Sequence, residues 1–239
     1  MTDPRASLAA MNNADLYQAV FDCRHLRYRR TDRSFMAVDA PPPYYAHMTV
    51  TKPLTAGELG DELAVLARHR GGLGVKDSFC RLDLSDHGFS TGFTAAWIWR
   101  GPMASAMPSG WTILRDSPAL LAWEAAWKSH GSPTEGRMFP DAALRNRDLV
   151  FLAEVEGHAI TAGCLANRSD QCVGLSNVFG RAPSPQLFAA AAQAVSSVFP
   201  GVPITGYERG LDLDHALACG FGTVGPLRVL FADSPRFSQ

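Results

Sequence analysis

The second half of the chain alternates apolar strands with amphipathic helices. Residues 117–131, SPALLAWEAAWKSHG, have the pattern of a helix, with Ser117 as its N-cap, Pro118 at the first helical position and Gly131 beyond its end. Three strands with tight turns between them then predict an antiparallel meander, followed by a helix from Ser184 to Phe199. The expected strands are residues 111–116, 149–155, 159–167, 172–179, 203–208 and 224–231, with a short helix at 213–220 before the last of them.

The first half has a shorter pattern of the same kind. A helix is expected around 14–21, and the prolines of APPPYY (40–45) interrupt regular structure because proline supplies no amide donor. Beyond them, residues 44–50, 74–79 and 93–100 are predicted strands, and 55–71 space their leucines as on a helix face. The segment Gly101–Gly110, rich in small residues and proline, predicts a linker between two units.

A short sequence pattern occurs once in each half. RLDLSDHGF (81–89) precedes the apolar strand FTAAWIW, and RGLDLDHALACGF (209–221) precedes VGPLRVLF. In both places a strand comes before the LDL sequence, a short helix ends at a Gly-Phe pair, and a final apolar strand follows. The repetition indicates two related units whose strands could join one sheet.

Composition narrows the class of protein. Of 239 residues, 46% are hydrophobic, and 22 basic and 23 acidic side chains leave a formal net charge of −1, which predicts a soluble globular chain with no nucleic-acid partner and no membrane partner. The five cysteines are odd in number and never in CxxC spacing, as expected in a reducing compartment. The first residues lack the pattern of a signal peptide, so we expect a cytoplasmic protein.

The order of elements from Trp111 onward, with the Gly-Phe pair after its last short helix, resembles the GNAT superfamily of acyl-CoA-dependent N-acyltransferases. The chain as a whole is similar to actinobacterial-type GNAT proteins with a truncated N-terminal copy. The resemblance implies a mixed α/β fold with a largely antiparallel sheet flanked by helices. It also implies three parts: an N-terminal helical segment (1–39), a truncated GNAT-like half (40–108) and a GNAT-like acyltransferase domain (109–239).

The turn FGRAPSPQLF occupies the place of the family's pyrophosphate-binding loop. Ala182 and Ser184 stand where the family has glycines, and Pro183 and Pro185 remove two amide donors. Two interpretations remain open: a weakened phosphate site in which Arg181 compensates for lost donors, or a strand-to-helix joint capped by Ser184. The resemblance implies a binding site for acetyl-CoA or another acyl-CoA, as co-substrate, made by the residues Ser176, Asn177, Val178, Gly180, Arg181, Ala182 and Ser184.

Both catalytic groups that the family often uses are missing. Ala216 stands where a tyrosine commonly protonates the leaving thiolate, and Gly174 stands where a carboxylate is common. Acyl transfer needs a base for the amine and a proton donor for the thiolate. We therefore expect Glu208 and Tyr207, at the end of a strand, to supply them, with Glu154 and His215 as further candidates.

Two functions follow from these patterns. The first is an acyltransferase that moves an acetyl or related group from CoA to an amine of a small molecule or peptide. The second is a catalytically degenerate GNAT-fold protein that holds a metabolite or partner chain in its cleft. No metal-ligand spacing, nucleophile elbow or P-loop occurs in the sequence, and we expect no metal site. The sequence leaves the oligomeric state open.

Overall fold

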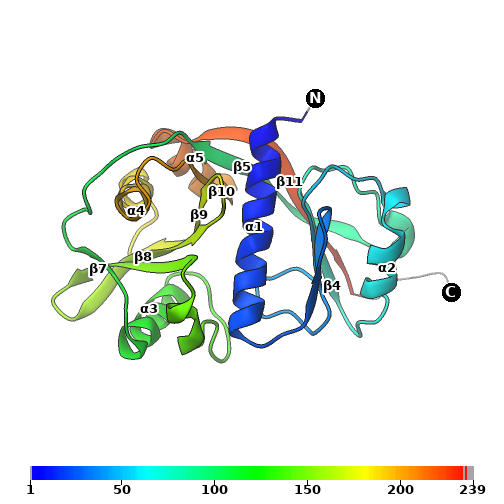
Figure 1. The fold of residues 1–239 in the computed structure, drawn as a ribbon, viewed down its shortest axis with the longest axis horizontal. Helices are drawn as coiled ribbons and strands as arrows, with labels where there is room; N and C mark the ends of the chain where they lie inside the picture. Colours follow the sequence, from blue (N-terminus) through cyan, green and yellow to red (C-terminus); the bar gives the residue numbers. More distant parts are fainter. Residues whose placement is uncertain (1, 234, 236–239) are drawn as a thin grey trace.

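The strands of the chain form one continuous, mostly antiparallel sheet (Figure 1). The computed structural model describes residues 2–233 and residue 235, and within them the strand order is β1-β2-β3-β4-β11-β5-β10-β9-β8-β7-β6. The parallel pairs in this part of the chain are β3 with β4 and β9 with β10. The strands are β1 (Tyr28–Arg30), β2 (Ser34–Ala37), β3 (Met48–Val50), β4 (Leu73–Asp77), β5 (Ser90–Arg100), β6 (Trp111–Ile113), β7 (Leu149–Glu156), β8 (Ala159–Arg168), β9 (Val173–Gly180), β10 (Ile204–Glu208) and β11 (Gly222–Ala232).

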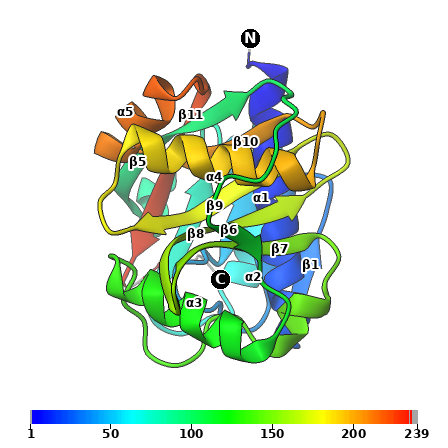
Figure 2. The ribbon, with the colours of Figure 1, turned by 90° about the vertical axis from the view of Figure 1, so that its left-hand side faces the viewer.

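Helices cover both faces of this sheet. The long helix α1 (Pro4–Cys23) lies across its middle in Figure 1 and contacts strands of both halves. Helix α3 (Ser117–Ser129) shares a core with α1, whereas α4 (Pro185–Val198) and α5 (Gly210–Ala218) share a core on the opposite face; Figure 2 shows β8 between α3 and α4. The shorter helices are α2 (Gly60–Leu66) and the 3₁₀ turns η1 (Ala56–Glu58), η2 (Ser85–His87) and η3 (Asp141–Arg145).

Strands of the second half are buried on both faces, because successive side chains point to opposite sides of a sheet. In β7, Phe151 and Ala153 pack with α1 and α3, while Leu152 between them packs with α4. In β8, Cys164 and Leu165 divide between the two faces in the same way. Burial on both faces explains why these segments are nearly continuous apolar runs in the sequence.

The two halves of the chain, β1–β5 and β6–β11, exchange their last strands. Strand β5, from the first half, lies between β10 and β11, and β11, from the second half, lies between β4 and β5. The central order is β3-β4-β11-β5-β10-β9. If β3, β4 and β5 are exchanged with β9, β10 and β11, the same order results, read from the opposite edge. Each half completes the hydrogen bonding of the other, so the strands of both belong to one sheet.

The repeated Gly-Phe pairs close their helices in the same way. The amide of Phe89 donates to the carbonyl of Leu84 at 3.1 Å, and that of Phe221 donates to Ala216 at 3.1 Å, which is the longer bond of a Schellman motif. The glycine before each phenylalanine has a positive φ, 82° in the first half and 96° in the second. Both phenylalanines are buried, and each leads into one of the two exchanged strands.

The structure departs from the expected pattern most clearly at the N-terminus. The first helix begins at Pro4 rather than near Ala14. Residues 28–37, expected within a helical segment, contain the strands β1 and β2, and β2 pairs with β3 along its length. The pairing places four consecutive buried residues, Ser34–Ala37, in the sheet, and sheet pairing of this kind overrides local propensity.

Helix boundaries also differ from the expectation. The N-cap of α3 is Asp116 rather than Ser117: its Oδ1 accepts a hydrogen bond from the amide of Ala119 at 2.9 Å. The Ser117 hydroxyl instead donates to Asp141 Oδ1 at 2.6 Å. The helix expected over 55–71 is divided into η1 and the seven residues of α2.

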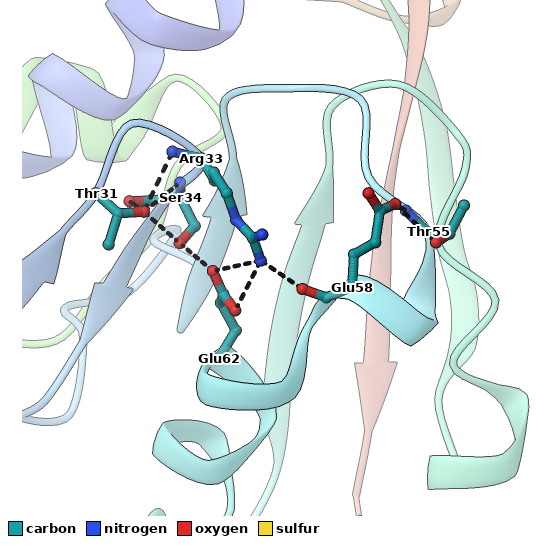
Figure 3. A network of polar contacts seen from close by, with 6 residues as sticks. All are labelled: Thr31, Arg33, Ser34, Thr55, Glu58 and Glu62. Carbon is teal, nitrogen blue, oxygen red and sulfur yellow. Dashed lines mark hydrogen bonds and ion pairs between the residues drawn. The ribbon is translucent and has the colours of Figure 1, made fainter.

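A polar network fixes α2 to the β1–β2 turn (Figure 3). The buried carboxylate of Glu62 accepts hydrogen bonds from the Ser34 hydroxyl at 3.1 Å and from the Arg33 guanidinium at 3.4 Å, and Arg33 also donates to the carbonyl of Glu58. One residue before η1, the Thr55 amide donates to the Glu58 carboxylate at 2.8 Å. The hydrogen bonds from Ser34 and Arg33 satisfy the carboxylate of Glu62, whose burial would otherwise be costly.

Candidate functional site

A cleft opens where two parallel strands separate. Strands β9 and β10 pair only at Val173–Gly174 with Ile204–Thr205 in the described chain, and beyond this point β10 continues along β5 alone. The cleft between them has a volume of about 250 Å³ and is covered by α1. It is lined by Ala9, Asn12, Asn13, Leu16, Tyr17, Tyr44, Tyr45, Lys76, Trp97, Trp127, Ser132, Asn167, Gly174, Leu175, Ser176, Asn177, Val178, Gly206, Tyr207 and Glu208.

A β-bulge in β9 borders this cleft. Two residues, Asn177 and Val178, lie opposite a single residue of β8, because Phe179 pairs with Gly163 and Ser176 with Leu165. Asn177 adopts a φ of 52°, a left-handed conformation that asparagine tolerates better than most residues. The bulge takes the backbone of Asn177 and Val178 out of the regular β8–β9 ladder beside the cleft.

Tyr207 and Glu208 both line the cleft from β10. Neither side chain makes a hydrogen bond or ion pair with another described residue. Burial, and secondarily the negative charge of Asp212, raises the pKa of the Glu208 carboxyl to about 8. Burial, and secondarily the charge of Glu208, raises the pKa of the Tyr207 phenol to about 12. Near pH 8 the Glu208 carboxyl is half ionised and can accept a proton, while the Tyr207 phenol stays protonated and can donate one.

The cleft also contains a buried lysine that is not among the residues predicted from the sequence. Lys76 of β4 is 2% exposed, and its Nζ donates to Asn13 Oδ1 at 2.9 Å. The ammonium lies 4.2 Å from the ring centre of Tyr207 and 5.1 Å from that of Tyr17. Burial lowers the pKa of the amine to about 7. A lysine directly after the apolar residues of the short strand LGVKD was the sequence signal for it.

The absence of a carboxylate at Gly174 has a steric reason. A Cβ at this position would lie 2.1 Å from Asn167 Oδ1 and 2.3 Å from Asn12 Oδ1. These two asparagines bond each other's backbone: Asn12 Nδ2 donates to the Asn167 carbonyl at 3.0 Å, and Asn167 Nδ2 donates to the Asn12 carbonyl at 3.0 Å. Asn12 of α1 and Asn167 of β8 therefore fill the space that a side chain at position 174 would need.

The turn Gly180–Ser184 lines a second hollow, apart from the cleft. Ser184 is the N-cap of α4, as expected, and its Oγ accepts from the Leu187 amide at 3.2 Å. The hollow is also lined by Glu154 and Glu156 of β7, and the described residues around it include none from β10 or α5. Arg181, 66% exposed, pairs with Glu156 at 3.0 Å. Ser176, Asn177 and Val178 therefore lie together with Glu208 and Tyr207, whereas Gly180, Arg181, Ala182 and Ser184 form a separate group.

The two remaining sequence candidates lie outside the cleft. Glu154 accepts a hydrogen bond from the Thr161 hydroxyl at 3.0 Å in the second hollow. His215 of α5 lies beside the ring of Phe188, with ring centres 6.5 Å apart. Within the described residues no group of three or more His, Cys, Asp or Glu side chains is placed to hold a metal ion. Neither Glu154 nor His215 lines the cleft that contains Glu208 and Tyr207.

Replacing Lys76 with methionine is expected to stabilise the protein by about 3 kcal/mol near neutral pH, because a buried ammonium without a counter-charge is costly. Since the pKa falls from 10.5 to about 7 on folding, the unfolded chain binds the extra proton between these values, and the stability of the parent rises across this pH window. Urea unfolding of K76M and the parent, from about pH 6 to pH 10, measures the difference. The advantage of K76M should shrink toward pH 10; an advantage independent of pH would contradict this account.

Comparison with solved structures identifies the fold. The GCN5-related N-acetyltransferase from Kribbella flavida matches with a TM-score of 0.62 at 12% identity, over 94% of this chain and 95% of that one. A putative acetyltransferase of the GNAT family from Novosphingobium aromaticivorans matches with a TM-score of 0.57 at 12% identity, over 91% and 96%. A functionally unknown conserved protein from Staphylococcus epidermidis matches with a TM-score of 0.58 at 11% identity, over 87% and 94%.

The chain has the mixed α/β fold of GNAT acyltransferases, as the sequence resemblance implied. No protein-family model and no curated protein matches its sequence. None of the helices in residues 2–233 is long and apolar enough to cross a membrane. Likeness at this identity establishes the fold, and function has to be argued from the cleft.

Proposed function

We propose that the protein is an acyl-CoA-dependent N-acyltransferase that transfers an acetyl or related acyl group to the amine of a small molecule or peptide. The observation that carries the proposal is the pair Glu208 and Tyr207, which line the cleft beside the β9 bulge and make no hydrogen bond or ion pair with another described residue. A carboxylate of raised pKa and a phenol are the acid–base groups that aminolysis of a thioester requires.

Each group has one role in the proposed reaction. Glu208 accepts a proton from the ammonium of the acceptor, and the freed nitrogen attacks the thioester carbonyl carbon. Backbone groups at Ser176, Asn177 and Val178 hold the acyl-CoA, and amides at the bulge stabilise the developing oxyanion. The carbon–sulfur bond then breaks and the Tyr207 hydroxyl protonates the departing thiolate, while the phenolate left on Tyr207 takes the second proton of the attacking nitrogen. The products are a neutral amide and free CoA, and Glu208 releases its proton to solvent.

The phosphate end of the co-substrate is the weaker part of the site. We propose that the turn Gly180, Arg181, Ala182 and Ser184 contacts the CoA pyrophosphate at the N-terminus of α4, with two amides already lost to proline. The ion pair between Arg181 and Glu156 competes for the guanidinium, and two glutamates line the same hollow. Affinity for CoA should therefore depend more on the cleft than on the turn.

Variants at this ion pair test the role of the turn. We expect R181A to weaken CoA binding about fivefold, because an exposed charged contact contributes on the order of 1 kcal/mol. E156Q should strengthen binding by a few-fold, because it frees Arg181 and removes a negative charge from the hollow. Calorimetric titration with CoA at low and high salt measures both effects. If both variants bind CoA as the parent does, the turn is only a capped joint.

A direct experiment tests the function. The protein is titrated calorimetrically with acetyl-CoA and free CoA, and is then incubated with acetyl-CoA and a panel of amines while released thiol is measured. We expect binding of acetyl-CoA and thiol release that depends on the amine. Absence of binding up to about 1 mM ligand, equivalent to roughly −4 kcal/mol, would exclude the acyltransferase.

A second function, a catalytically degenerate GNAT-fold binding protein, is favoured by the turn alone. Pro183 and Pro185, with Arg181 engaged by Glu156, are what a site released from phosphate binding would contain. Such a protein would bind a metabolite in the cleft without CoA. The same titration separates the two functions, because only the enzyme needs affinity for acetyl-CoA.

We also infer that the chain consists of a truncated GNAT-like half, predicted from the sequence as residues 40–108, and a fuller domain, predicted as residues 109–239. The symmetric central strand order and the matching Gly-Phe closures support this division. The correspondence includes β1 and β2, so the first half would begin near Tyr28 rather than at residue 40. The actinobacterial type and the cytoplasmic location remain predictions from the sequence.

A further inference from the structure

The walls of the cleft are aromatic, and one buried cation lies among them. Six of the lining residues are Tyr17, Tyr44, Tyr45, Trp97, Trp127 and Tyr207. Lys76 projects from β4 on the α1 side, with the Tyr17 and Tyr207 rings against its ammonium. Aromatic walls suit an apolar or aromatic group of a ligand, and the cation suits an anionic group.

Lys76 has no anionic partner in the described part of the chain. Its one hydrogen bond goes to the neutral amide oxygen of Asn13, although an ammonium has three donors. The next residue, Asp77, points to the other face, where it pairs with Arg228 at 3.0 Å. Glu208 lines the same cleft but forms no ion pair with the lysine.

A buried charge without a counter-charge is costly, and buried charges in proteins are normally paired. The structure satisfies Glu62 and Asp77, the buried carboxylates of the first half, with arginines. Among the buried charged residues of the first half as described, Lys76 alone has no partner of opposite charge, and it alone lines the cleft. A ligand anion would complete its coordination.

We propose that Lys76 binds a carboxylate on the acyl acceptor, so that the substrate is an amine that also carries a carboxylate and an apolar or aromatic group, such as a hydrophobic amino acid. This inference rests on the proposed function. The carboxylate pairs with the ammonium on the α1 side, the apolar group lies against the tyrosines, and the amine is directed to Glu208. Lys76 acts as a specificity-determining residue contributed by the first half to the cleft of the second.

Matched ligands test the proposal without CoA. Phenylalanine and phenylethylamine share the amine and the ring and differ in the carboxylate. By calorimetry, we expect the parent to bind phenylalanine about tenfold to a hundredfold more tightly than phenylethylamine. K76M should lose this preference. K52M is the matched control, because Lys52 is an exposed lysine paired with Asp32 outside the cleft, and it should keep the preference.

The outcomes separate this proposal from the proposed function. Equal binding of the two ligands by the parent, retention of the preference by K76M, or no binding of phenylalanine or of any amino acid in a hydrophobic panel would each overturn it. Binding of carboxylate-bearing amines without acyl transfer would support Lys76 while contradicting the enzyme. Acyl transfer to amines regardless of a carboxylate would support the enzyme while contradicting Lys76.

Discussion

Replacing Glu208 with glutamine is expected to lower kcat/KM for acyl transfer about 100- to 10,000-fold, the usual contribution of a general base. In the parent, the rate should rise with pH through a midpoint near 8 to a plateau above it, because burial and the neighbouring Asp212 raise the pKa of the carboxyl to about 8 and only its ionised form accepts a proton. E208Q should lose this rise as well as the rate. Steady-state kinetics across the pH range, with acetyl-CoA saturating, measure both.

The variant D212N is the control for this assignment. It removes the like charge that helps to raise the pKa of Glu208, so the midpoint of the pH profile should move to lower pH while the plateau rate is kept. A structural role for Glu208 would give a different result: E208Q would lower the rate without altering the profile, and D212N would not move the midpoint.

Replacing Asp77 with alanine is expected to destabilise the protein by about 3 to 5 kcal/mol, the cost of breaking a buried ion pair from one side. Asp77 is 0% exposed and accepts hydrogen bonds from the amides of Phe79, Arg81 and Leu82 at 3.3, 3.1 and 2.9 Å, as well as pairing with Arg228 of β11. The substitution leaves three amides without their acceptor, and the guanidinium keeps only the Leu82 carbonyl, at the pairing of β4 with β11. Urea unfolding followed by tryptophan fluorescence measures the loss.

Asp83, a few residues along the same segment, is the matched control. Its exposed carboxylate accepts from the amide and hydroxyl of Ser85, at 3.1 and 2.7 Å, so D83A should cost much less than D77A. If D77A unfolds at the same urea concentration as D83A, the bonds of Asp77 do not hold β4 to β11. A fall in cooperativity in D77A alone would show instead that the halves begin to unfold separately.

Local patterns predicted much of the fold. The meander β7–β8–β9, the helix after it and the short helix before β11 were recognised because hydrophobic periodicity is set by the side chains of each element. Ser184 was recognised as a cap because the serine bonds the backbone three residues on. The same local logic misplaced the cap of α3, since Asp116 and Ser117 are both good capping residues and the contact of Ser117 with Asp141 depends on a distant segment.

The candidate site was predicted in part. Glu208 and Tyr207 were predicted because, in this fold, the ends of the two parallel strands that separate lie beside the cleft. In the structure they line the same cleft as Ser176, Asn177 and Val178. The bulge at Asn177 left no readable pattern, because a bulge depends on the partner strand as much as on its own residues. Lys76 and Tyr17 were missed because the segments that carry them reach this cleft only through pairing and packing across the whole molecule.

Local sequence was enough to specify most strands and helices of the second half and how the two Gly-Phe closures end their helices, since these depend on interactions within a few residues. It did not specify β1 and β2, which lie in a segment expected to be helical and are held by sheet pairing. It was not enough to specify neighbours in the sheet. Backbone hydrogen bonds are the same for any partner strand, so no local pattern records that β5 lies between β10 and β11 or that β11 lies beside β4. That exchange brings Lys76 to the side of Tyr207, and only long-range pairing and packing against α1 could place them together.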